Sequence, residues 1–176
     1  QAGTTQALAW QLPPPRDEAV RLRCDRVYGA CERLARFQIG QVRPWDQDPA
    51  LSLLTDSKST ENFIRPNTGT VEGLAFLFRF GPYDDKQVGL SRAELLQTTI
   101  IPMMRYLTST HVTGSRPTGD GKRWGDTWQS AHWTSALGRA GWWLEADLPD
   151  DLARIIRRVV AHEADRIATA SPPHQV

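Results

Sequence analysis

The sequence predicts an all-α protein built from helical hairpins. Apolar residues recur at helical spacing in several segments, and helix-start and helix-stop signals flank those segments. No segment shows the strict alternation of a half-buried strand. The chain has 176 residues, enough for one domain with a buried core. We therefore expect residues 1–176 to form a single helical domain.

The first predicted helix spans about 16–38. It follows the run Pro13-Pro14-Pro15, and Gly40 provides its C-cap. The two cysteines of the chain, Cys24 and Cys31, fall on this helix. At that spacing they would lie about 10 Å apart along the axis, beyond disulfide reach. We expect two buried thiols on one helix face.

Residues 41–69 follow no period and are interrupted by prolines. We expect a long functional loop there, with a short helical turn near 50–54. A second helix is predicted over 70–80, directly after an Asn-Thr-Gly turn at 67–69. Because the apolar segment is short, a buried strand is the competing interpretation.

The third predicted helix spans 91–110. Ser91 and Glu94 form a capping box at its start, and Pro102 should kink the helix without ending it. A second long functional loop, 111–125, leads to a fourth helix over 126–144. A fifth helix begins near Asp150, where acidic residues suit a helix N-terminus, and carries a solvated face that includes Arg166.

The composition excludes some classes of function. The formal net charge is +1, which argues against a dedicated nucleic-acid surface. No apolar run approaches the roughly 20 residues of a membrane span. The first residues lack the pattern of a signal peptide, and Gln1 in place of Met indicates an upstream processing site or a trimmed start. We expect a secreted or periplasmic protein.

Chemistry-bearing residues gather between 111 and 144. Five of the seven tryptophans lie between 124 and 143, beside Asp126, Gln129 and His132. Aromatic faces next to an acid, an amide and an imidazole suit stacking on a sugar ring and hydrogen bonding to its hydroxyls. Asp126 is also a helix N-cap candidate. Trp124 and Trp128, four residues apart, should share one helix face, as a ligand platform or as packing.

Other residues of this region have two interpretations each. Trp142 and Trp143 are expected in the core, because the small residues around them suit a tightly packed helix. His132 fits a structural or a functional role, and His111 opens the glycine-rich loop 111–125. Arg116 and its basic neighbours in that loop would meet the carboxylate of an acidic sugar or form a solvated turn; the pattern of a phosphate loop is absent.

A second polar segment surrounds the turn at 67–69. Asn67 precedes the predicted helix and Glu72 lies in its first turn, much as Gln129 does in the fourth helix. A polar turn with a helix cap is the plain alternative. In a helical ring, loops that precede helices of the same direction emerge at the same end. We therefore expect the two long loops to lie together.

Two segments carry a family resemblance, NFIRPNTGTVEGLAFLF at 62–78 and RWGDTWQSAHWTSALGRAGWWL at 123–144. They resemble the α/α toroids of secreted polysaccharide lyases and related glycoside hydrolases, including the heparinase II/III-like group. The resemblance implies that the chain is part of a larger toroid whose helix pairs ring a sugar-binding cleft. The implied substrate is a polysaccharide or oligosaccharide, with no cofactor.

The resemblance also implies roles for single residues. In an elimination, Asn67 or Arg116 would neutralise a uronate carboxylate, and His111 or His132 would take the proton. In a hydrolysis, Asp126 and Glu72 would be the pair of carboxyl groups. The substrate-binding residues would be Asn67, Arg116, Trp124, Trp128 and Gln129.

No Cys/His spacing indicates a metal site. The alternative function is a non-catalytic glycan-binding module or a helical scaffold for protein interactions. In the scaffold, all the clustered tryptophans would be buried.

Overall fold

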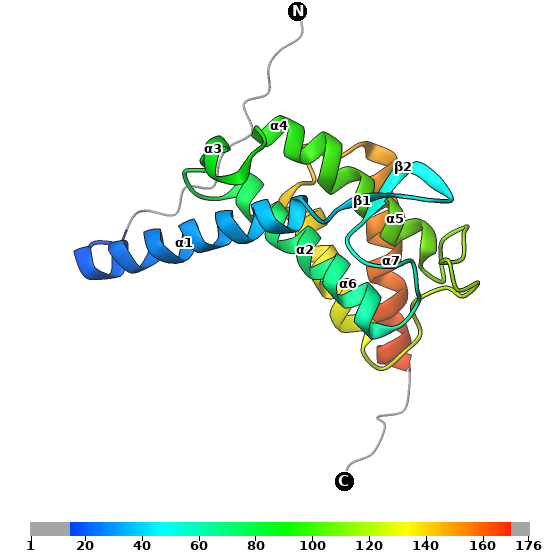
Figure 1. Cartoon of the computed structure of the whole chain (residues 1–176). Helices are drawn as coiled ribbons and strands as arrows, with labels where there is room; N and C mark the ends of the chain where they lie inside the picture. Colours follow the sequence, from blue (N-terminus) through cyan, green and yellow to red (C-terminus); the bar gives the residue numbers. More distant parts are fainter. Residues whose placement is uncertain (1–14, 170–176) are drawn as a thin grey trace, which may run out of the picture.

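The computed structural model describes residues 15–169 (Figure 1). Within this range the chain is mainly helical and contains one two-stranded sheet. The predicted all-α class is therefore confirmed at the coarse level. The expectations for Gln1, for the prolines at 13 and 14, and for the end of the chain after 169 lie outside the described residues.

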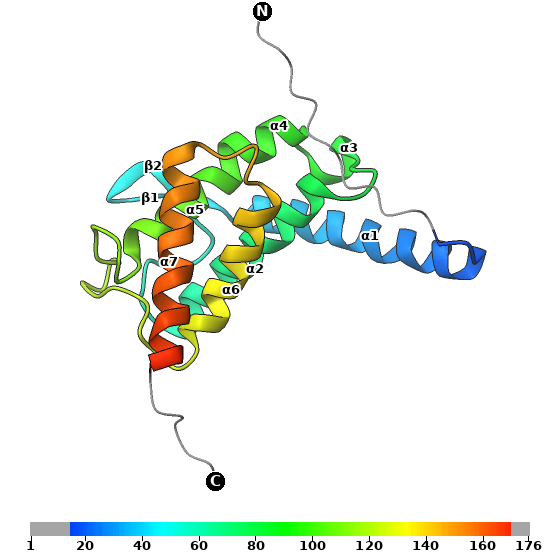
Figure 2. The same cartoon turned by 180° about the vertical axis from the view of Figure 1, so that it is seen from behind.

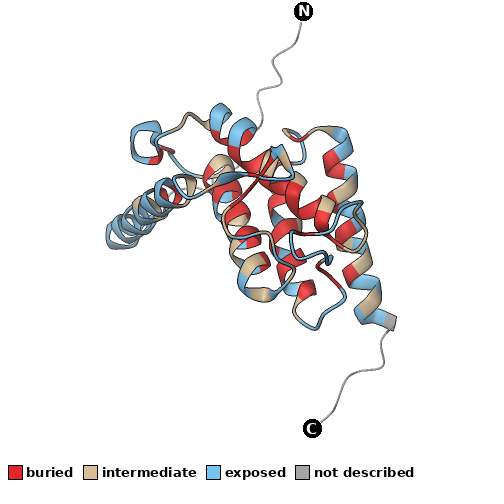
Figure 3. Ribbon diagram, turned by 45° about the vertical axis from the view of Figure 1, so that its right-hand side comes forward, coloured by how far each residue is buried: buried red, intermediate tan, exposed pale blue. Residues whose placement is uncertain are grey.

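Helix α1, Glu18–Ile39, projects away from the rest of the molecule (Figures 1 and 3). The Asp17 carboxylate caps it by accepting the Val20 N–H at 2.9 Å. Because only the C-terminal part of α1 packs on α2 and α3, Cys24 is exposed and Cys31 half-buried. Both thiols are free, as expected, but the prediction that both are buried is wrong.

Residues 43–53 form a β-hairpin. Strand β1, Arg43–Trp45, pairs antiparallel with β2, Asp48–Leu53. The helical turn predicted near 50–54 is therefore wrong. The last three residues of β2 are buried, where the strand packs on α5. Trp45 meets Tyr106 of α5 edge-on, with ring centroids 5.3 Å apart, so tertiary packing decides the local structure.

Helix α2, Glu61–Arg79, begins nine residues before the predicted start at 70. The Asn-Thr-Gly turn at 67–69 is instead helical and carries Pro66 immediately before it. Ile64, Thr68 and Val71 are buried at helical spacing, so packing overrides the local preference of these residues for a turn. The alternative of a buried strand is excluded.

The predicted helix over 91–110 is confirmed. It consists of α4 (Arg92–Glu94), a π-helical stretch η1 (Leu95–Ile100) and α5 (Ile101–Thr110); the short helix α3 (Asp85–Val88) precedes it. Both hydrogen bonds of the Ser91–Glu94 capping box are present. The wider turns of the π-helical stretch directly precede Pro102. They accommodate the missing N–H of this proline, so the helix continues.

Helices α6, Ser130–Trp143, and α7, Asp150–Thr169, complete the described chain. The predicted start of α7 is confirmed. The prediction that this helix starts at 126 is wrong. Gln129 occupies the N-cap position of α6, and Asp126 has a left-handed backbone, with φ 55°. Asp126 is therefore not the N-cap of α6.

The long helices form two antiparallel pairs. In the first pair, Arg92 before α5 donates to Phe78 O near the end of α2, and Tyr106 in α5 donates to Ser57 before α2. In the second pair, Gly141 of α6 packs against Ile156 of α7 (Figure 2).

The two pairs stack with α2 and α6 side by side and parallel. Glu72 of α2 pairs with Arg139 in the middle of α6, and Arg79 at the end of α2 donates to Trp143 O at the end of α6. The two long loops consequently emerge at the same end, as expected. They touch there: Asp120 accepts hydrogen bonds from the backbone N–H and the hydroxyl of Ser59.

The core lies between these four helices (Figure 3). Its largest fully buried side chains are Trp124, Tyr106, Ile64, Leu74, Leu77, Leu95, Ile100, Met103, Met104, Leu107, Leu137 and Leu144. Of the helices between residues 15 and 169, none combines the length and apolar character that crossing a bilayer requires.

The close contact of α6 with α7 generates a stability prediction. A Cβ on Gly141 would lie 2.8 Å from Ile156 Cγ2, so Gly141→Ala should lower the free energy of unfolding by about 1–3 kcal/mol. Gly73 on α2 has open space around it, and Gly73→Ala should raise this free energy by about 0.5–1 kcal/mol. Urea unfolding followed by circular dichroism measures both; equal effects would contradict the packing.

Candidate functional site

The loop between α5 and α6, residues 111–129, closes on itself at its base. Val112 N–H donates to Trp124 O at 2.8 Å, and Trp124 N–H donates to Thr110 O at 3.1 Å. These bonds bring the start of the loop beside its end. His111 and Asp126, fifteen residues apart in sequence, thereby reach the same stretch of α7.

A buried carboxylate on α7 holds this loop base. Glu163 is 1% exposed. It accepts hydrogen bonds from Ser130 Oγ at 2.7 Å, from the Asp126 backbone N–H at 2.9 Å and from Arg166 Nη2 at 2.8 Å. His111 Nε2 lies 3.4 Å from the same carboxylate. We call these five residues the Glu163 network.

The network keeps Glu163 ionised. Burial alone raises the pKa of the Glu163 carboxyl. The hydrogen bonds from Ser130, Arg166, the Asp126 backbone and His111 outweigh burial and hold this pKa at about 2. The carboxylate therefore stays charged throughout the neutral range and acts as a fixed anchor.

His111 is fully buried and works as part of the anchor. Its Nδ1 accepts the Thr113 backbone N–H at 3.2 Å, which leaves the proton on Nε2, facing Glu163. Burial lowers the pKa of His111, although Glu163 opposes this shift. The His111 ring also packs edge-on against Trp124, with centroids 4.6 Å apart. A neutral, enclosed imidazole cannot touch a polymeric substrate.

The anchor positions an exposed acid–imidazole pair. Asp126 lies in the left-handed region, a conformation that costs energy for a residue other than glycine, and its N–H is held by Glu163. Its carboxylate Oδ1 lies 2.7 Å from His162 Nε2. The side chains of Asp126 and His162 are 51% and 36% exposed, so solvent reaches both.

This pair has the parts of an acid–base group. A carboxylate bonded to one imidazole nitrogen fixes the orientation of the ring. The pair is within reach of solvent, whereas Glu163 behind it is not. Backbone strain that a buried network maintains is a feature of functional sites.

Asp126, His162 and Glu163 each offer a ligand atom, and these atoms lie within 4.8 Å of one another. Both oxygens of Glu163 already accept hydrogen bonds, and the Arg166 guanidinium lies 2.8 Å from one of them. A divalent cation would have to displace that positive charge. The donor set fits a hydrogen-bonded network better than a metal centre.

The predicted tryptophan platform is not formed. Trp124 is 1% exposed and its indole N–H donates to Leu107 O, whereas Trp128 is 85% exposed. Neither lies in a helix, because α6 begins at Ser130, so the two rings do not share a helix face. Trp128 alone offers an indole to solvent at this turn.

The other predicted catalytic residues lie elsewhere. Glu72 pairs with Arg139 in the middle of α6, and His132 is exposed on the first turn of that helix. Of the four predicted catalytic residues, the hydrogen bonds bring together His111 and Asp126, through Glu163. The predicted carboxyl pair of Asp126 and Glu72 is not assembled around one site.

The remaining predicted binding residues have structural partners. Asn67 is 1% exposed and ties α2 to Leu54 and Thr55. Arg116 pairs with Asp48 of the hairpin. Gln129 is half-buried at the N-cap position of α6.

The two tryptophans expected in the core differ. Trp143 is half-buried and meets Phe80 edge-on, with centroids 5.5 Å apart. Trp142 is 73% exposed, so the prediction that it lies in the core is wrong. Trp142, which directly precedes Trp143 on α6, points away from the neighbours that cover Trp143, because adjacent helical positions face different directions.

Sequence reasoning missed four members of the site: His162, Glu163, Ser130 and Arg166. One signal was present. Ile156 and Val159 continue at helical spacing to Glu163, which places a carboxylate on the apolar face of an amphipathic helix. Arg166 was assigned to the solvated face but donates to Thr127 O and Glu163.

Comparisons of the chain with protein-family models, curated proteins and solved structures found no match.

The anchor generates a stability prediction. Glu163→Ala should lower the free energy of unfolding by about 3–5 kcal/mol, because Arg166 and three other donors lose their buried acceptor. Glu145→Ala, which removes an exposed carboxylate, should change it by less than about 1 kcal/mol. Chemical denaturation measures both variants. A loss below 1 kcal/mol for Glu163→Ala would contradict the anchoring role.

The low pKa of Glu163 predicts a pH dependence. The pKa is lowered from 4.5 to about 2 in the folded state, so the stabilisation is complete above pH 4.5 and is lost as pH falls toward 2. The shift corresponds to about 3 kcal/mol. Denaturation of the wild type and of Glu163→Gln at several pH values measures it. The difference in stability between the two proteins should shrink over this interval, and a constant difference would contradict the assignment.

Proposed function

We propose that the chain is a helical-hairpin part of an α/α toroid in a secreted or periplasmic polysaccharide-degrading enzyme. The observation that carries the proposal is the exposed Asp126–His162 pair, fixed by a buried network at the end of the helix pairs where both long loops emerge. The enzyme would be a lyase or a glycoside hydrolase.

The helix arrangement supports the toroid. The pairs α2/α5 and α6/α7 repeat one unit, with α2 and α6 parallel neighbours in one layer and α5 and α7 in the other (Figures 1 and 2). Continued repetition of such a unit around an axis gives a ring with an inner and an outer layer. The loops before α2 and α6 would then border one rim.

The chemistry of the pair favours elimination over hydrolysis. In an elimination, His162 would accept the C5 proton of the uronate while the C4–C5 double bond forms and the bond from C4 to the glycosidic oxygen breaks. Water would protonate the leaving oxygen, and Asp126 would orient the His162 ring. Hydrolysis requires two carboxyl groups at the sugar. Glu163, the carboxylate nearest the pair, is buried and bonded to Arg166, so it is unsuited to serve as the second group.

Trp128 supports a carbohydrate substrate. It follows Asp126 by two residues and leaves 85% of its surface in solvent. The flat apolar face of an exposed indole is suited to stacking on the face of a sugar ring.

A non-catalytic glycan-binding or scaffold module is the second candidate. The exposed rings of Trp128 and Trp142 favour it, because binding through aromatic surfaces needs no acid–base group. Product formation separates the two candidates, since a binding module leaves a polysaccharide intact.

Variants of two exposed histidines test the enzyme. The protein is incubated with acidic and neutral polysaccharides; ultraviolet absorbance reports an unsaturated elimination product, and reducing ends without it report hydrolysis. His162→Ala should lower the turnover number by about 100-fold or more. His132→Ala on α6 is the matched control and should retain activity. Full activity of His162→Ala, or no product from any polysaccharide, would contradict the proposal.

Variants of two exposed tryptophans test substrate binding. Trp128→Ala should raise KM several-fold with little effect on stability, because the ring packs on few neighbours. Trp142→Ala, at the other end of α6, should leave KM unchanged. Equal effects of the two substitutions would count against a platform at Trp128.

A further inference from the structure

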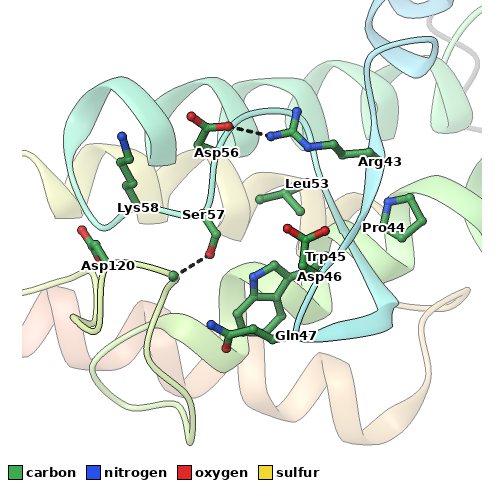
Figure 4. A pocket seen from close by; sticks show the side chains of 11 residues that line it. Arg43, Pro44, Trp45, Asp46, Gln47, Leu53, Asp56, Ser57, Lys58 and Asp120 are labelled. Carbon is green, nitrogen blue, oxygen red and sulfur yellow. Dashed lines mark hydrogen bonds and ion pairs between the residues drawn. The ribbon is translucent and has the colours of Figure 1, made fainter.

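A hollow of about 420 Å³ opens between the β-hairpin, the loop before α2 and the tip of the loop 111–129 (Figure 4). This volume lies in the range of small-molecule sites. Its lining includes Trp45, Asp46, Gln47, Asp56, Lys58 and Asp120.

The walls are fixed in place by hydrogen bonds between the two loops. Ser57 Oγ accepts the Gly119 N–H at 2.9 Å and the Tyr106 hydroxyl at 3.0 Å. Asp120 accepts from the Ser59 hydroxyl and backbone. The hollow is therefore preformed, which lowers the entropic cost of binding.

Trp45 brings an unused donor to this hollow. The residue is 3% exposed, and its indole nitrogen lies on the edge turned toward Ser57 (Figure 4). Between residues 15 and 169, the enclosed side-chain nitrogen and oxygen atoms that lack a partner are Trp133 Nε1 and Thr134 Oγ1. The Trp45 indole nitrogen is not one of these enclosed atoms, so its N–H faces open space and can donate to a ligand oxygen in the hollow.

The remaining groups offer both acceptors and donors. Asp46 and Gln47 sit exposed at the hairpin turn, and the Lys58 ammonium lies 4.7 Å from the centre of the Phe63 ring. Burial raises the pKa of Asp120, but the hydrogen bonds from Thr118, Ser59 and the Lys122 backbone hold it at about 2, so it stays ionised. A polyhydroxylated ring can donate to the carboxylates of Asp46 and Asp56 and accept from Lys58, Gln47 and Trp45.

The charge of the hollow selects against an anion. Three carboxylates, Asp46, Asp56 and Asp120, face two cations, and one of these cations, Arg43, is already paired with Asp56 at 2.7 Å. An acidic sugar placed here would meet more negative than positive charge. Uncharged hydroxyl groups carry no such penalty.

We infer that this hollow is a binding site for an uncharged sugar unit, recognised by the Trp45 indole N–H together with the carboxylate, amide and ammonium groups of its rim. The inference rests on the proposed carbohydrate function and narrows its substrate class. The substrate is a heteropolysaccharide in which a neutral, hydroxyl-rich unit occupies the hollow, while the chain continues toward the loop 111–129 with the uronate unit at which the elimination occurs.

Calorimetric titration with two sets of oligosaccharides tests the inference. The probes are neutral cello-, xylo- and manno-oligosaccharides and acidic oligogalacturonides. The wild type should bind at least one neutral probe more tightly than the acidic one. Gln47→Trp, which fills the hollow from its exposed turn, should abolish that binding. Asp46→Ala should weaken it about three- to tenfold through the loss of one acceptor.

The matched control is Asp25→Ala, which removes an exposed aspartate from α1 and should leave binding unchanged. Absence of binding to every neutral probe, binding of the acidic probe that is lost in Gln47→Trp, or unchanged neutral-probe binding in Gln47→Trp would each overturn the inference.

The assay of polysaccharide breakdown separates the two proposals. If the wild type degrades a polysaccharide but the neutral probes do not bind in the hollow, the inference fails and the proposed function stands. If the neutral probes bind in the hollow and no polysaccharide is degraded, the catalytic proposal fails and the binding site stands.

Discussion

The ionised carboxylate of Glu163 determines how the loop between α5 and α6 lies on α7. Four donors from different parts of the chain converge on it: the side chains of His111, Ser130 and Arg166, and the backbone of Asp126. A buried charge is tolerated only when it is paired and fully hydrogen-bonded, so these donors cannot rearrange independently. The start of α6 and the base of the loop are therefore fixed together.

This anchor explains the unusual backbone of Asp126. With its N–H held by Glu163, the residue adopts a left-handed conformation and turns its carboxylate to His162. The preceding Gly125, with φ 124°, leaves no room for a Cβ, which would lie 2.8 Å from His111 Nε2. A buried, unreactive layer of Glu163 and His111 thus supports an exposed, titratable pair. A preorganised site needs reactive groups that are held in place by a layer of residues that do not react themselves.

The sequence predicts the parts of this fold that depend on local signals. Amphipathic spacing and the Ser91–Glu94 capping box give the helices around α5 and α7 correctly. The early start of α2 is missed, because the packing of Ile64 and Asn67 overrides a turn-like sequence. The hairpin is missed because the contact of Trp45 with Tyr106, far apart in sequence, stabilises it.

The site is predictable only in part for the same reason. Asp126 and His111 were identified from their neighbours in sequence, whereas their partners His162 and Glu163 lie more than thirty residues away on a helix with an apparently solvated face. Trp124 and Trp128 are four residues apart, yet one is buried and the other exposed, because the chain between them is not helical. Spacing identifies a shared face only where the secondary structure is known.

Native-state hydrogen exchange of the Asp126 backbone amide tests the anchoring role of Glu163 most directly. If Glu163 holds this N–H as described, the amide exchanges only when α7 opens, with protection close to that of the helix core. Exchange at the rate of a free loop, while the amides of α7 stay protected, would contradict the account.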